Sequence, residues 1–200
     1  MKKPLNKIQY DPVAKTLHWL IALAIIGMLA LGWIMQALPN GPDKFSLFQW
    51  HKSVGITIML LAVARLLWRW RHPPPSLPLS MPRWEKTAAH AGHILLYVLM
   101  IAMPFVGWVI VSASPMNLPT ILYGCVPWPH LPFLPEMANK GEIGHGAAKV
   151  HGYLAWMIVA VASGHFIAAL KHHFIDRDNV LTRMMPQFLN GFLNRMRGLK

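Results

Sequence analysis

Four long apolar stretches constrain this chain more than any other feature. Of its 200 residues, 54% are hydrophobic and only 13% are charged, which is too apolar for an ordinary soluble domain. Each stretch has about the twenty residues that a helix needs to cross a bilayer. They run from about Leu17 to Leu38, Phe48 to Trp70, Ala88 to Val111 and Ala147 to Leu170. Because isolated strands leave backbone groups unsatisfied in lipid, the sequence predicts an all-α fold, one integral membrane four-helix bundle over residues 1–200.

The basic residues predict how this bundle is oriented. The net charge of +12 would suit a nucleic-acid partner, but the charges gather at the helix ends. Fifteen fall on one side: Lys2, Lys3, Lys7, Lys15, Arg65, Arg69, Arg71, Arg83, Lys86, Lys171, Arg177, Arg183, Arg195, Arg197 and Lys200. The other side has four: Lys44, Lys52, Lys140 and Lys149. The positive-inside rule then places both termini in the cytoplasm of a bacterial inner-membrane protein, and no nucleic-acid partner is needed to explain the charge.

The connections differ in length and composition. The cytoplasmic linker from His72 to Pro82 is rich in proline and should run extended. The second outer connection, about Ser112 to Gly146, is the longest and is rich in proline and aromatic residues. It could form a lid or a docking surface, or it could lie among the lipid headgroups with its aromatic residues as anchors. The single cysteine, Cys125, allows no internal disulfide and is given no role.

Four histidines stand inside or at the start of the apolar stretches. His151 and His165 are fourteen residues apart, which places them on one helix face about 21 Å apart along the axis. His18 and His51 begin the first and second stretches. Matching the depths pairs His18 with His165 on the inner side and His51 with His151 on the outer side. Each alone could be a packing histidine, but polar groups in the membrane are costly, and four at two matched depths indicate function.

Two haems, each held between two imidazoles, explain this arrangement better than a bare metal ion. A path for a divalent cation would be expected to offer carboxylates, but the four stretches contain no Asp or Glu. The zinc-binding motif H-E-x-x-H is also absent. Small residues could make room for the haem, or they could serve ordinary helix packing: Gly27, Gly32, Gly55, Gly107, Gly152 and Gly164. Four basic residues are placed either to meet haem propionates or to snorkel to the interface: Lys52, Arg65, Arg69 and Lys149.

The chain also resembles the bacterial cytochrome b561 family over about Tyr10 to Pro186. Four segments carry the resemblance: LHWL, HKSVG, AHAGHILLYVL and ALKHHFIDRDNVLTRMMP. The resemblance implies four helices that bind two b-type haems through histidines on the first, second and fourth helices. The matching positions are the same four histidines, His18, His51, His151 and His165. For some members, the resemblance implies oxidation of superoxide with the electron passed to ubiquinone.

Iron held by two protein imidazoles has no open position, which favours electron transfer over oxygen chemistry. A quinone is the natural membrane partner. Four histidines gather at the cytoplasmic edge: His90, His93, His172 and His173. An imidazole there can bond a quinone carbonyl and move its proton near neutral pH. The resemblance points to His93 and His172 as this quinone site, whereas His90 and His173 are expected to be solvated interfacial residues.

The outer haem needs its own electron donor. Lys52 adjoins His51, and Lys149 lies two residues before His151. With Lys44 and Lys140 they could draw superoxide to the haem edge, so Lys52 and Lys149 are the predicted capture residues of a superoxide-oxidising, quinone-reducing oxidoreductase. Two alternatives remain open: a periplasmic electron-transfer protein as partner, or a role as the haem membrane anchor of a larger dehydrogenase.

Overall fold

The computed structural model describes residues 9–196, and four helices dominate it. Predictions that involve Lys2, Lys3, Lys7, Arg197 and Lys200 therefore lie outside the described residues. The helices are α1 (Pro12–Ala37), α2 (Pro42–Arg71), α3 (Arg83–Ser112) and α4 (Lys140–Phe174). All four are long and apolar enough to cross a membrane. The predicted all-α, four-helix membrane architecture is confirmed.

Each helix begins several residues before its apolar stretch, because polar residues and prolines start the first turns. Pro12 and Pro42 occupy the first positions of α1 and α2, where their missing N–H is not needed. Asp11 caps α1: its carboxylate accepts hydrogen bonds from the Ala14 amide at 2.9 Å and the Trp68 indole at 3.0 Å. Partial burial raises the pKa of Asp11, but these hydrogen bonds outweigh it and lower the pKa below its ordinary value.

The helices pack in a row: α1 lies on α2, α2 on α3, and α3 on α4. The small apolar core, with Ile21, Ile58, Ala62 and Met100 at its centre, lies where α1, α2 and α3 meet. Most other large apolar side chains are exposed, as expected for surfaces that face lipid. In contrast, α1 and α2 make few close backbone contacts with α4, so the row does not close into a tightly packed ring.

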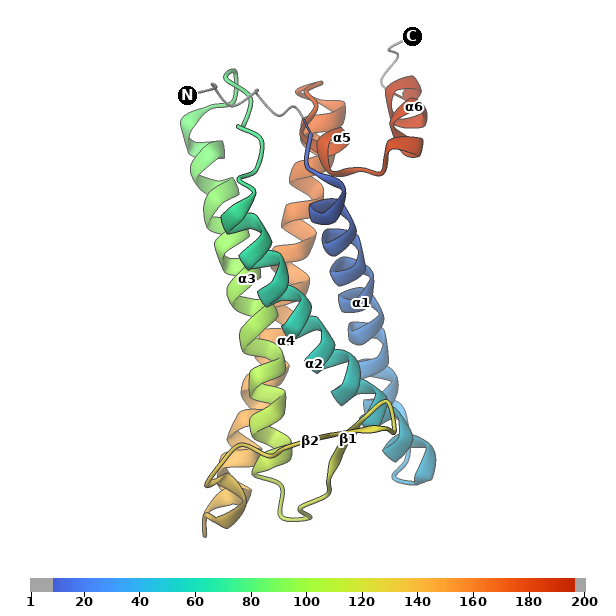
Figure 1. Ribbon diagram of the computed structural model, residues 1–200, viewed down its shortest axis with the longest axis vertical. Helices are drawn as coiled ribbons and strands as arrows, with labels where there is room; N and C mark the ends of the chain where they lie inside the picture. Colours follow the sequence, from blue (N-terminus) through green and yellow to red (C-terminus); the bar gives the residue numbers. More distant parts are fainter. Residues whose placement is uncertain (1–8, 197–200) are drawn as a thin grey trace.

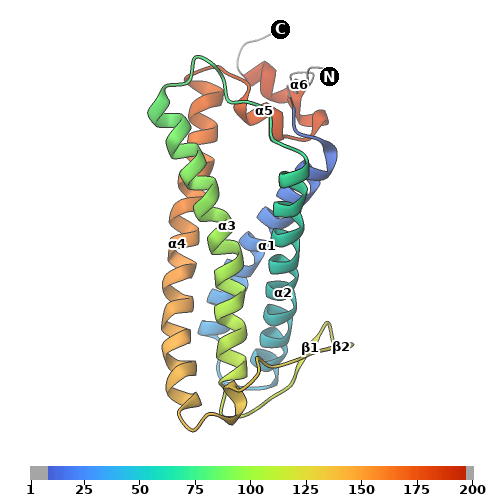
Figure 2. The same ribbon diagram turned by 60° about the vertical axis from the view of Figure 1, so that its left-hand side comes forward.

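The two ends of the bundle carry different structures (Figures 1 and 2). One end has the linker of residues 72–82 and the short helices α5 (Val180–Met184) and α6 (Gln187–Met196). The other end has the connection of residues 113–139, with an antiparallel hairpin of β1 (Thr120–Leu122) and β2 (Val126–Trp128) and a 3-10 turn η1 (Leu134–Glu136). We refer to these as the α6 end and the hairpin end. The long outer connection is shorter than predicted, because α4 already begins at Lys140.

We expect the α6 end to face the cytoplasm, because ten of the described basic residues belong to it and only four lysines to the hairpin end. A fluorescent reporter fused after Lys200 should therefore be active, and alkaline phosphatase fused at the same point should be inactive. The opposite pattern would reverse the orientation but would leave the histidine pairs unchanged.

Candidate functional site

The structure brings the four predicted histidines together in two pairs. At the hairpin end, His51 on α2 faces His151 on α4 with ring centroids 6.2 Å apart. Toward the α6 end, His18 on α1 faces His165 on α4 at 6.3 Å. We call these the outer and inner pairs. They are formed by the helices that the sequence pattern indicated, at two levels along α4.

Both pairs have the spacing that one metal ion between two imidazoles requires. A first-row metal ion binds an imidazole nitrogen at about 2.0 Å, and the ring centre lies about 1 Å further, so the two ring centres should be about 6 Å apart. The pairs also bridge α4 to α1 and to α2, which are the helices that do not pack closely on α4. A flat cofactor between these helices therefore fits the observed packing, and the histidines fit haem.

Small residues and an unpartnered nitrogen at the outer pair agree with this fit. A Cβ added at Gly107 would lie 3.3 Å from Cε1 of His151, and one at Gly32 would lie 3.9 Å from Cε1 of His51. These two glycines thus let the rings approach the neighbouring helices. Within residues 9–196, the buried Nδ1 atom of His51 has no hydrogen-bond partner. An imidazole nitrogen without a protein partner is free to bind a metal.

The other glycines predicted to make room have different surroundings. Gly55 lies beside the methyl end of Met28, at 3.7 Å for an added Cβ. An added Cβ would meet nothing within 4 Å at Gly27, Gly152 and Gly164. The open space at these three positions agrees with either role, making room for a haem or ordinary helix packing.

Two arginines lie near the inner pair. The guanidinium of Arg65 is held over the ring of Tyr97, 5.6 Å from its centroid. Arg65 and Arg69 are half-buried and line a groove together with Tyr10 and Tyr97. The residues that line this groove include members of α1, α2 and α3. Their position is compatible with contacts to haem propionates.

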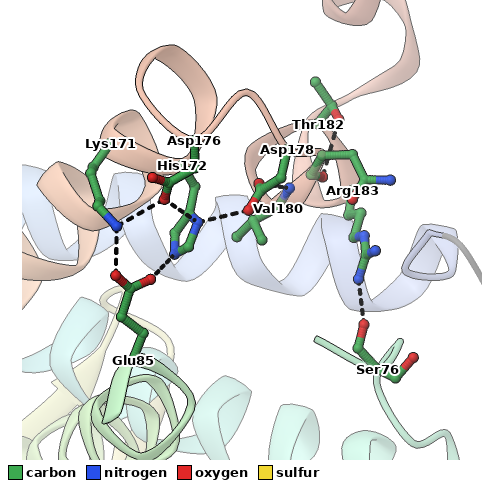
Figure 3. Close-up of polar contacts among 10 residues, drawn as sticks. Ser76, Glu85, Lys171, His172, Asp176, Asp178, Val180, Thr182 and Arg183 are labelled. Atoms are coloured by element: carbon green, nitrogen blue, oxygen red, sulfur yellow. Dashed lines mark hydrogen bonds and ion pairs between the residues drawn. The ribbon is translucent and has the colours of Figure 1, made fainter. Parts of the chain in front are cut away.

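The structure gives the two predicted quinone histidines different surroundings. His93 on α3 lies beside His165, with ring centroids 5.4 Å apart, so it belongs to the environment of the inner pair. His172, at the end of α4, instead lies in a charged cluster (Figure 3). Its Nδ1 is 2.8 Å from Asp178 and 3.0 Å from Asp176, and its Nε2 is 3.7 Å from Glu85. His172 is almost fully buried.

Lys171 completes this charged cluster. Its ammonium group is 2.6 Å from Glu85 and 2.9 Å from Asp176. The carboxylates were not predicted as site residues. Two of them, at four and six residues after His172, stand within the segment that carried the family resemblance. Glu85 could not be found in this way, because only the packing of α3 against α4 brings it to His172.

His90 and His173 also differ from each other. His90 is exposed, as expected, and its Nδ1 is 2.6 Å from the carbonyl oxygen of Lys86. The expectation for His173 was wrong: this side chain is fully buried rather than solvated. Its Nε2 lies 3.2 Å from the carbonyl oxygen of Leu193, because α6 folds back over the end of α4.

The four lysines of the hairpin end lie around the outer pair. Lys52 is half-buried, with Nζ 3.4 Å from the carbonyl oxygen of Pro119, and Lys149 is exposed. The amines of Lys44 and Lys140 donate to backbone carbonyls of Leu38 and Pro135, both at 2.9 Å. In the described part of the chain none of the four pairs with a carboxylate. Three carboxylates belong to the same end and reduce the excess positive charge: Asp43, Glu136 and Glu142.

The hairpin is attached to α2 beside the outer pair. The amide of Tyr123 donates to Ser53 Oγ at 2.9 Å, and its hydroxyl is 2.7 Å from Thr57 Oγ1. Its ring packs edge-on against Trp50 at 5.7 Å. Since Trp50, Ser53 and Thr57 all lie within six residues of His51, the outer connection rests on the part of α2 that carries the outer pair. The sequence holds no signal for this long-range contact.

Comparisons with known proteins agree with the geometry. A family model described as prokaryotic cytochrome b561 matches residues 9–187. Cytochrome b561 homolog 2 of Escherichia coli (strain K12) is 36% identical over 178 residues, which cover 88% of this chain and 91% of the relative. Cytochrome b561 homolog 1 of the same organism is 30% identical, with 86% and 93% covered. A Yersinia pestis protein named probable superoxide oxidase CybB is 34% identical, with 90% and 97% covered.

Proposed function

Because the chain belongs to the prokaryotic cytochrome b561 family, a family of membrane electron-transfer proteins that bind haem b, we propose that it carries two haems and oxidises superoxide to reduce ubiquinone. In this proposal superoxide reacts at the hairpin end, on the periplasmic side of the bacterial inner membrane. The quinone is reduced toward the α6 end. The chain would thus be a quinone-reducing oxidoreductase.

The observation that carries this proposal is the presence of two histidine pairs with the same spacing at two levels of the bundle. His51 and His151 would hold one haem, and His18 and His165 the other. When bound, each haem would be held by the two imidazoles of its pair and would supply one-electron transfer. Fourteen residues of α4 separate the two levels by about 21 Å, so the two haems would lie one above the other along the bundle axis.

The chain's own residues account for the remaining requirements of the reaction. Each superoxide loses one electron and leaves as dioxygen, and reduction of one quinone needs two such electrons and two protons. Lys52 and Lys149 would draw the anion toward the outer pair. His93 would bond a quinone carbonyl beside the inner pair. His172 has one nitrogen toward Glu85 and the other toward Asp178, so it would pass protons from the water on the cytoplasmic side to the quinone.

The choice of superoxide is supported by the name of the Yersinia pestis relative and by the lysines around the outer pair. A second candidate, a periplasmic electron-transfer protein as donor, is favoured by exposed apolar residues on the outer connection. These are Met116, Val126 and Phe133, with exposed fractions of 73%, 51% and 80%. Exposed apolar residues at the rim of a redox site are typical of a docking surface.

We expect superoxide alone to reduce the haem of the purified protein, and the rate to fall as salt rises. Attraction between an anion and exposed lysines is screened over a Debye length of about 8 Å at physiological ionic strength. Replacing both Lys52 and Lys149 with Gln should lower the rate of haem reduction by superoxide at low salt about threefold. The expected effect is small because the carboxylates of the hairpin end offset part of the positive charge. Stopped-flow measurement of haem reduction across a salt series gives both results.

The matched control is Lys86→Gln, which removes a positive charge from the α6 end and should leave the superoxide rate unchanged. Quinol-driven haem reduction should respond to neither salt nor the lysine changes at the hairpin end. If the rate of haem reduction by superoxide changes neither with salt nor when Lys52 and Lys149 are replaced, electrostatic steering by these lysines is excluded. If superoxide reduces no haem at all, the donor is a protein, and co-purification of a soluble partner would identify it.

A further inference from the structure

Helix α6 (Gln187–Met196) has an apolar face that the bundle does not cover. Leu189 and Leu193 are half-buried against the bundle. Phe188, Phe192 and Met196 follow one another at intervals of four, so they share one face of the helix, and 82%, 62% and 54% of their surfaces are exposed. Apart from Gln187, the helix lies beyond the residues that match the family model.

The contact with α4 holds α6 in place with this face outward. The buried His173 donates from Nε2 to the carbonyl oxygen of Leu193 at 3.2 Å. The carbonyl belongs to a residue on the bundle side of α6, and the three exposed apolar residues lie away from it. The apolar face is therefore exposed to the medium around the protein at this height of the bundle.

The level is that of a membrane interface. In both views α6 lies at the height of the first turns of α3 (Figures 1 and 2). Trp70, near the end of α2, and Trp84, near the start of α3, are 77% and 69% exposed. Exposed tryptophans at helix ends are typical of the belt where a membrane protein meets the headgroups. In a bilayer that the four helices span, α6 would lie at the height of the lipid headgroups.

The charge of this end selects the kind of lipid. Arg195 is exposed on α6, three residues after Phe192, and so lies next to the apolar face. Further basic residues of the same end are Arg71, Arg83, Lys86 and Arg177. An amphipathic helix with Phe on one side and Arg beside it has the properties of an interfacial helix bound to acidic lipid.

We propose that α6 is an interfacial helix that binds acidic phospholipid. Phe188, Phe192 and Met196 insert at the boundary between headgroups and acyl chains, and Arg195 contacts the lipid phosphates. The inner-leaflet end of the bundle is thereby attached to the membrane through a helix outside the four spans. This binding is independent of the electron donor and acceptor.

Site-specific labelling of the full chain in nanodiscs tests this proposal. In a Cys125→Ser background, an uncharged fluorophore is attached at Phe192→Cys on the apolar face or, as matched control, at Asn194→Cys on the polar face of the same helix. Quenchers are bromine on the lipid acyl chains and iodide in the water. With phosphatidylglycerol present, we expect bromine to quench the label at position 192 about threefold more than the label at 194, and iodide to show the reverse order.

Two further measurements separate lipid from protein as the occupant and test the role of charge. Replacing phosphatidylglycerol by phosphatidylcholine should reduce the bromine quenching at position 192, and Arg195→Gln should weaken this lipid dependence. Far-UV circular dichroism checks that each variant keeps its helices. Equal quenching at 192 and 194 would overturn the proposal. Shielding of the label at 192 from both quenchers would also overturn it, since a protein surface would then cover α6. Quenching without any lipid dependence would refute the binding of acidic lipid.

Discussion

Replacing His151 with alanine is expected to remove one haem and leave the other. The outer pair would lose one of its two imidazoles, and no other described histidine ring lies as close to His51. The inner pair, formed by His18 and His165, lies at a different level of α4 and should keep its haem. Roughly half of the reduced-minus-oxidised signal should therefore be lost, with a haem-to-protein ratio near one instead of two. His165→Ala should remove the inner haem by the same argument.

A control on the same helix makes this result specific. His145 is exposed and lies six residues before His151 on α4, so His145→Ala should keep the full haem content. The two ligand variants should also differ in the potential of the haem that remains, because each retains a different centre. A wild-type protein with no haem, or with one haem at full occupancy, would contradict the proposed pairs. Loss of both haems in each single variant would show that the two centres are not independent.

Replacing His172 with glutamine is expected to slow electron exchange between haem and quinone about a hundredfold while both haem spectra stay nearly intact. The side chain is not part of either histidine pair, so haem binding does not depend on it. Its nitrogens face Asp178 and Glu85, which places it to move protons at the α6 end. Glutamine keeps a hydrogen-bonding side chain but cannot carry the proton. Stopped-flow oxidation of the haem by a soluble quinone measures the effect.

Two comparison variants make the assignment of His172 testable. Glu85→Gln, which removes a carboxylate partner, should slow the same step and change its dependence on pH, because proton delivery and not quinone binding is affected. His90→Gln, which replaces an exposed histidine of the same end, should change neither the rate of electron exchange nor its dependence on pH. If His172→Gln alters neither the rate nor the quinone affinity, the quinone site lies elsewhere, and the environment of His93 is the next position to test.

The sequence predicted the spans and the histidine pairs because both depend on distance along a helix. A run of apolar residues shows which segments can cross a bilayer, and a rise of 1.5 Å per residue converts sequence spacing into depth. The depths of His18 and His51 on separate helices then follow from the alternating direction of the chain. The start of α4 at Lys140 was less predictable, because its first turn is polar and resembles a loop.

What the sequence by itself determined is therefore the arrangement along the membrane normal: four helices, two levels of histidine, and a basic end opposite a nearly neutral one. Only the tertiary structure decided which groups lie side by side. It brought Glu85 to His172, placed His93 beside His165, attached Tyr123 to the turns of α2 around the outer pair, and buried His173 under α6. The physical reason is that depth is set locally by helix geometry, whereas lateral neighbours depend on how helices distant in sequence pack together.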